Sequence, residues 1–93
     1  MNKTELTKNA HTLYTKFLKE NNGKEPVCAS CLIEYKDDKS TLEVNIALYD
    51  QTPEGWEDDD IFFYTSGIQD LCSLADDDEN GEDFIITEIF ELL

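Results

Sequence analysis

Two neighbouring stretches of this chain alternate between apolar and polar residues, and they constrain its fold more than any other feature. The clearer one runs from Thr41 to Tyr49, where Leu42, Val44, Ile46 and Leu48 occupy every second position. A period of two is typical of a β-strand that buries one face. The stretch from Val27 to Tyr35 alternates as well, and the polar residues 36–40 between the two are typical of a turn. We therefore predict a β-hairpin.

The first 23 residues predict an amphipathic helix. Asn2 followed three positions later by Glu5 is a typical helix start. Apolar residues then recur at spacings of three and four, and Asn22-Gly23 favours a left-handed end to the helix.

The second half of the chain predicts a strand, a helix and another strand. Ile61 to Thr65 is β-branched and aromatic, as strands prefer. Ser66 and Gln69 have the spacing of a capping box, which would begin a helix reaching to Ala75. Phe84 to Phe90 resumes as a strand. Its apolar residues alternate poorly, so that both of its faces are expected to be covered.

These elements follow one another as α-β-β-β-α-β. We predict a single α+β domain spanning residues 1–93, with a four-stranded mixed, mostly antiparallel sheet and two helices packed on one face. A strand, a helix and a strand in succession suggest a crossover unit, in which the two strands run parallel. Asp58–Asp60 precede the first of these strands and Asp76–Asp83 precede the second. A parallel arrangement would therefore gather both acidic runs at one end of the sheet.

The charge is unusually negative and unevenly distributed. The chain carries 22 acids against seven basic residues, for a net charge of −15. All seven basic residues are lysines at or before Lys39, whereas residues 40–93 hold 16 acids and no base. Direct binding to nucleic acid or to an anionic membrane is disfavoured by this balance. Neither a signal peptide nor a membrane-spanning segment is apparent, and three cysteines are a poor basis for disulfides, so we expect a cytoplasmic protein.

Two patterns suggest chemistry, each beside a simpler reading. Cys28 and Cys31 have C-x-x-C spacing but lie in a strand pattern, where they would point to opposite faces; a zinc site would need Cys72 and His11 as well. Asp76, Asp78 and Asn80 resemble the start of an EF-hand loop. Thr87 stands where the bidentate glutamate belongs, so only weak cation binding is expected. No residue nominates a nucleophile and base pair, so we expect neither an enzyme nor a cofactor.

The acidic surface carries the functional prediction. We expect a small non-enzymatic protein that docks its carboxylates on a basic partner, such as a nuclease or regulator that binds nucleic acid. This chain is similar in size and charge to the nucleic-acid-mimicking inhibitors of nucleases that phages and mobile elements encode. The residues expected to bind the partner are Trp56, Glu57, Asp58, Asp59, Asp60, Asp76, Asp77, Asp78, Glu79, Glu82 and Asp83. Two alternatives remain open: an assembly domain that forms a homodimer through its sheet, and a module that binds divalent cations weakly.

Overall fold

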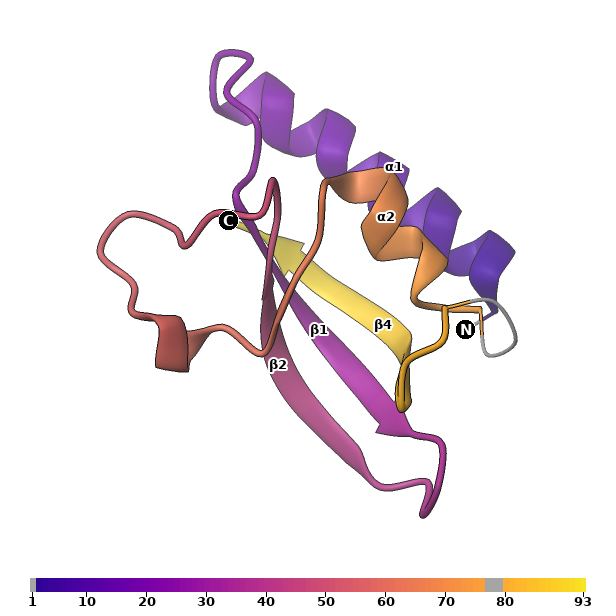
Figure 1. Cartoon of the computed structure of the whole chain (residues 1–93). Coiled ribbons are helices and arrows are strands. Elements are labelled where there is room, and N and C mark those ends of the chain that lie inside the picture. The colour runs from indigo at the N-terminus through magenta and orange to yellow at the C-terminus, as the bar shows by residue number, and fades with distance from the viewer. Residues whose placement is uncertain (1, 77–79) are drawn as a thin grey trace.

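The computed structural model describes residues 2–76 and 80–93 and confirms the predicted α+β fold and order of elements (Figure 1). Three strands follow the first helix, and a second helix and a fourth strand complete a single compact domain. The elements are α1 (Lys3–Glu20), β1 (Cys28–Tyr35), β2 (Thr41–Ala47), the short 3-10 helix η1 (Asp58–Asp60), β3 (Phe63–Tyr64), α2 (Ile68–Ser73) and β4 (Phe84–Leu92). Among the described helices, none is long and apolar enough to cross a membrane.

The helix α1 begins and ends as its sequence predicts. The Asn2 side-chain oxygen accepts a hydrogen bond from the Glu5 backbone N–H at 2.9 Å, which satisfies one of the unpaired donors of the first turn. After Glu20 the backbone turns left-handed at Asn22 (φ 56°) and Gly23 (φ 84°). The Gly23 N–H returns to the Leu18 carbonyl at 2.8 Å, as in a typical helix C-terminus.

The four strands are arranged in the order β3-β2-β1-β4. β1 pairs antiparallel with both β2 and β4, which places the predicted hairpin at the centre of the sheet. β3 pairs with β2 in parallel through Phe63 and Tyr64 only. The predicted strand over residues 61–65 is therefore shorter than expected, because Ile61 packs beneath a loop instead of continuing the ladder.

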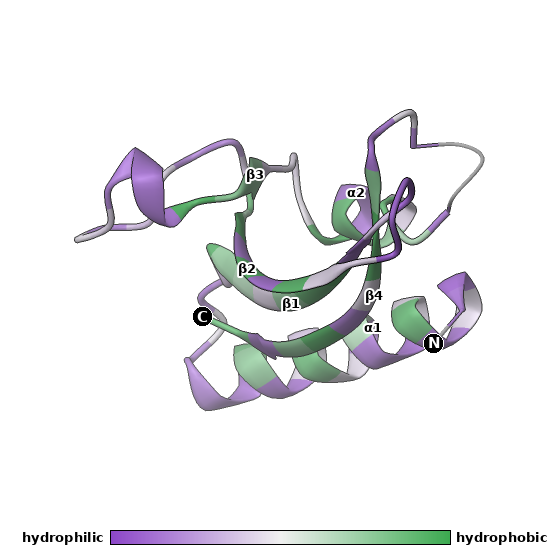
Figure 2. Cartoon of the chain, turned by 90° about the horizontal axis from the view of Figure 1, so that it is seen from below, coloured by the Kyte–Doolittle hydropathy of each residue, from purple (hydrophilic) through white to green (hydrophobic). Residues whose placement is uncertain are grey.

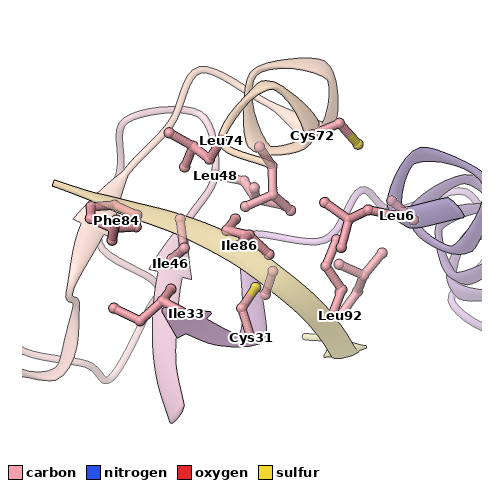
Figure 3. Packing of buried hydrophobic residues seen from close by; sticks show 14 residues of the cluster. Leu6, Cys31, Ile33, Ile46, Leu48, Cys72, Leu74, Phe84, Ile86 and Leu92 are labelled. Atoms are coloured by element: carbon pink, nitrogen blue, oxygen red, sulfur yellow. The ribbon is translucent and has the colours of Figure 1, made fainter. Parts of the chain in front are cut away.

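The core lies between the sheet and the two helices (Figure 3). Leu6 projects from α1 toward Ile86 and Leu92 of β4, and Leu71 and Leu74 from the α2 region close the same core. Ala29, Cys31 and Ile33 of β1 face it from below and are completely buried. Both helices thus cover one face of the sheet, as predicted.

The strand β4 buries a single face, although its apolar residues do not alternate regularly along the sequence. Its pairing with β1 shifts register twice, between Ser30 and Cys31 and between Leu32 and Ile33. Each bulge adds one residue, so Ile86, Ile89 and Leu92 all face the core at a spacing of three. The expectation that both faces of this strand are covered is wrong, because Phe90 lies at one of the shifts and is 43% exposed.

The outer edge of β4 is covered by its own chain. The Asn9 side chain of α1 donates to the Ile89 carbonyl at 3.1 Å. The Ile86 N–H donates to the Leu74 carbonyl at 2.9 Å, immediately after α2. These contacts satisfy groups that would otherwise be open to pairing with another strand.

The predicted capping box at the start of α2 does not form. α2 is only six residues long, and its N-cap is Gly67, which has no side chain to accept a bond. The Asp70 carboxylate reaches back instead and accepts from the Ser66 N–H at 3.1 Å. A carboxylate near a helix N-terminus is favoured for the same electrostatic reason as a capping hydroxyl.

The predicted crossover between β3 and β4 is correct in direction and wrong in position. The two strands run the same way, since β2 is parallel to β3 and β1 is antiparallel to both β2 and β4. However, they lie at opposite edges of the sheet and at different heights. Phe63 is level with Ile46, whereas Phe84 pairs with Tyr35, which bonds to Ser40. Six residues of strand separate these levels, about 20 Å at ~3.3 Å per residue.

Candidate functional site

The predicted acidic surface is divided by this arrangement. Trp56, Glu57 and η1 lie toward the edge of the sheet that β3 forms. Asp76, Glu82 and Asp83 lie toward the opposite edge, which β4 forms (Figures 1 and 2). Asp77, Asp78 and Glu79 fall outside the described residues. The prediction that both runs gather at one end is therefore wrong, because β3 starts beside the end of β2 whereas β4 starts beside the end of β1.

The first acidic run is held by its own side chains. The Asp60 carboxylate accepts from the Glu57 N–H at 3.0 Å and so caps η1. The Asp58 carboxylate accepts from the hydroxyls of Thr52 and Tyr64, each at 3.0 Å. These bonds fix the loop against the end of β2 while leaving the carboxylates exposed.

The second acidic run is organised around Asn80, which the sequence suggested as a weak cation ligand. Its side-chain oxygen accepts from the Lys36 ammonium at 3.1 Å and from the Glu82 N–H at 2.8 Å. Its amide group donates to the carbonyls of Leu74 and Phe84. An oxygen that already receives an ammonium is a poor cation ligand. The described residues contain no cluster of three or more metal-ligating side chains.

A different set of carboxylates gathers on the sheet face that the helices leave uncovered. Glu43 of β2 and Glu88 of β4 both pair with Leu32 of β1, one from each side. Residues directly opposite each other in antiparallel strands point to the same face. Glu91 pairs with Ser30, and Glu34 follows Leu32 by two positions, so both share that face.

Asp60 extends this surface at one side. It lines a shallow hollow of about 320 Å³ together with Trp56 and Asn45, and Asn45 pairs with Ser30 across the strands. Trp56 packs half-buried against Cys28, Ala47 and Ile61, which form a small apolar cluster beneath the loop. We call Glu34, Glu43, Asp60, Glu88 and Glu91 the acidic sheet face.

Among the described residues, no positively charged side chain pairs with the glutamates of this face. None of the seven lysines lies in a strand. Glu43, Glu88 and Glu91 are exposed, and none of them has an ion-pair or hydrogen-bond partner within residues 2–76 and 80–93. Glu43 and Glu88 stand two strand spacings apart, about 10 Å. Four glutamates and one aspartate thus form one negative surface, while four of the lysines lie on α1 across the sheet.

Sequence reasoning found the charge but missed where it gathers. The acidic runs drew attention because they are contiguous, whereas the four strand glutamates are spread over residues 34–91. Part of the signal was present in the alternation, because Glu34 and Glu43 occupy polar positions of the two predicted hairpin strands. Strict alternation in β4 would instead place Glu88 on the face of Ile86, and only the two bulges bring both Glu88 and Glu91 opposite the core.

The cysteines lie as the strand pattern predicted. Cys28 packs in the small cluster under Trp56, and Cys31 packs in the main core on the other face. Burial raises the pKa of the Cys28 thiol to about 11 and that of Cys31 to about 12. A redox pair needs thiols with a lowered pKa that can reach each other. The C-x-x-C spacing therefore has no geometry for disulfide exchange.

Two tyrosines on the helix side share a carboxylate. The Tyr14 hydroxyl donates to Glu25 at 3.0 Å. Burial, followed by the hydrogen bond and charge of Glu25, raises the pKa of the Tyr49 hydroxyl to about 12. Both groups are protonated donors at neutral pH.

We expect the protein to lose stability at high pH partly through Tyr49. Its folded pKa is above the unfolded value, so its contribution is complete below about pH 10 and is lost as the pH rises through about 12. The urea midpoint should therefore fall more steeply between about pH 10 and pH 12 in the native protein than in Tyr49→Phe. Equal slopes in the two proteins would show that Tyr49 does not titrate differently on unfolding. The lysines titrate in the same way in both proteins, so they do not contribute to the difference between the two slopes.

No protein-family model, curated protein or solved structure matches this chain. The description of its surface therefore rests on its own residues.

Proposed function

We propose that this protein is a small non-enzymatic binding protein that docks its acidic sheet face on a basic protein which itself binds nucleic acid. The observation that carries the proposal is the uncovered sheet face, where Glu43, Glu88 and Glu91 are exposed without a partner among the described residues. Like charges held this close repel one another and oppose folding. A basic partner would relieve that repulsion and would be attracted over a long range.

The charge density supports nucleic-acid mimicry. The longest dimension of the molecule is 40 Å. Duplex DNA of that length carries about 24 charges, at one per ~1.7 Å. The net charge of −15 on this chain is of the same order. A groove lined with lysine and arginine for a nucleic-acid backbone would therefore attract the acidic sheet face as well.

Homodimerisation through the sheet is less well supported as an alternative. The outer edge of β4 bonds to Asn9 and Leu74, and β3 offers only two residues for pairing. Stacking two acidic sheet faces would oppose like charges. Weak cation binding by the second acidic run is less well supported as well. The Asn80 side-chain oxygen, one of the candidate ligands, already accepts hydrogen bonds from Lys36 and Glu82.

Partner capture from a cell lysate of the source organism tests the proposal. The immobilised protein would be loaded at low salt and eluted with NaCl from roughly 50 to 500 mM, a range over which the Debye length shortens from about 14 to 4 Å. We expect elution of a basic nucleic-acid-binding protein within the gradient. Adding duplex DNA to the lysate should abolish its capture, because DNA and the acidic sheet face would compete for one groove.

A captured protein that remains bound throughout the gradient and in the presence of DNA would contradict the proposal. Capture of proteins without a basic surface would contradict it as well. Direct titration of the purified partner, with and without DNA, then gives the affinity and its salt slope.

A further inference from the structure

A second concave surface lies on the helix side of the molecule, across the sheet from the acidic face. It is a groove of about 1080 Å³ between α1 and α2. Thr7, Lys8 and His11 of α1 form one wall, and Ile68 and Cys72 of α2 form the other. Tyr49 lines the groove beside Tyr14, at the end farthest from the start of α1.

The groove combines an apolar floor with a cationic rim. Its interior presents the rings of Tyr14 and Tyr49 and the side chains of Ile68 and Cys72. Lys8 and His11 stand one turn apart on α1, where side chains three residues apart are neighbours. Lys8 has no ion-pair partner in the part of the chain that the structure describes. Threonine hydroxyls on the same helix face add hydrogen-bond donors to the rim.

No acid among the described residues lines the groove, whereas Lys3 and Lys8 do. The acids beside the groove keep their negative charge, and each accepts a hydrogen bond or pairs with a cation other than Lys8. These contacts are Glu5 with the Asn2 side-chain amide at 3.5 Å, Glu25 with the Tyr14 hydroxyl, Asp70 with the Ser66 N–H, and Asp76 with Lys3 at 3.5 Å. The lining of the groove therefore carries positive charge, on a protein whose total charge is −15.

Backbone strain holds Tyr49 in the groove. Its φ is 63° and that of Asp50 is 52°, so two successive residues other than glycine adopt the left-handed region. A bulky residue in this region is unusual and costs free energy. The turn carries the Tyr49 ring to the start of α2, where its Cε1 would lie 3.6 Å from a Cβ at Gly67. Strain of this kind is concentrated at binding sites, because it fixes a side chain in advance.

From this combination we propose that the groove binds a small anionic amphiphile, with its apolar body along Tyr49 and Ile68 and its anionic head at Lys8 and His11. The volume of about 1080 Å³ is close to the upper limit for sites that bind small molecules, for which about 300–1000 Å³ is usual. Charge complementarity selects an anionic head, and the apolar floor selects a hydrocarbon or aromatic body. The site lies across the sheet from the acidic face and does not depend on the function proposed for that face.

Decanoate, kept below its critical micelle concentration, is a suitable probe. It would be titrated into the ¹⁵N-labelled protein at roughly 0.15 M NaCl, where the Debye length of about 8 Å screens the distant carboxylates but not a contact with Lys8. We expect saturable amide shifts along the groove walls, in Thr4–Thr12 and Ile68–Ser73. The amides of Glu43 and Glu88 on the far face should not shift.

The reversal Lys8→Glu should weaken decanoate binding at least about tenfold, because it replaces a charge-assisted contact with repulsion. Lys16→Glu makes the same charge change on the same helix at an exposed residue that does not line the groove, and should weaken binding less than about threefold. Circular dichroism confirms that both variants fold.

Three results would overturn the proposal: equal losses in the two lysine variants, shifts that map outside the groove, or tighter binding of decyltrimethylammonium than of decanoate. The last would show that the total negative charge, and not the local rim, selects the ligand. An absence of saturable shifts with decanoate would exclude this class of ligand.

Discussion

Replacing Leu6 with alanine is expected to lower the free energy of unfolding by about 2–5 kcal/mol, the usual cost of removing a fully buried leucine from a packed core. Leu6 has no exposed surface and projects from α1 into the cluster that holds Ile86 and Leu92 (Figure 3). It also anchors the segment that carries Asn9, whose side chain covers the edge of β4. The loss should therefore weaken helix docking as well as leave a cavity.

Urea unfolding followed by circular dichroism measures this effect. Small domains are typically stable by about 5–15 kcal/mol, so a loss of this size would remove about 40% or more of the stability of a domain at the lower end of that range and lower its urea midpoint in proportion. Leu18→Ala is the matched control. It makes the same change on the same helix at a partly exposed residue that is not part of the core, and it should cost less than about 1 kcal/mol. Equal losses in the two variants would contradict the placement of α1.

Local patterns were sufficient to predict most of the fold. The alternation in Thr41–Tyr49 determines which face of β2 is buried, because a slip by one residue would expose the whole apolar set. Asn2 and Glu5 predicted the start of α1, and the bond between them is present. Each of these features depends on residues within a few positions of one another.

The position of β3 could not be predicted in the same way. Whether it lies beside β4 or beside β2, and at what height, depends on how residues 48–62 pack over Cys28 and Ala47. The left-handed turn at Tyr49 and Asp50 ends β2 earlier than the alternation suggests, and only Asp50 of the two is of a type that usually signals such a turn. This non-local choice separated the two acidic runs.

Asn80 shows how a sequence pattern can be correct as a loop and wrong as a site. The Asn-Gly step does end the loop before β4, with Gly81 at φ 71°. The side chain that resembles a calcium ligand instead bonds to backbone groups on both sides of the loop and to Lys36. The number of its hydrogen bonds depends on where α2 and β1 lie, which the loop sequence does not specify.

The acidic sheet face leads to the second prediction, since its charge is concentrated where no lysine lies. We expect the double variant Glu43→Gln, Glu88→Gln to bind a basic partner about 5- to 30-fold more weakly, if each lost exposed charge pair contributes ~0.5–1 kcal/mol. A 20-residue polylysine peptide serves as the probe, titrated by calorimetry at about 0.1 M salt, where the Debye length is about 10 Å.

The matched control is Glu5→Gln, Glu20→Gln, which removes two exposed charges on α1, across the sheet from the acidic sheet face, and leaves the net charge equal to that of the first variant. It should weaken binding less than about threefold, because charges separated from the contact by more than ~10 Å are largely screened. If both variants bind equally, the total charge drives association and the sheet face has no special part in it. A selective loss in the first variant would instead show that the register of β1 with β2 and β4 builds the docking surface, because that register alone brings Glu43 and Glu88 to either side of Leu32.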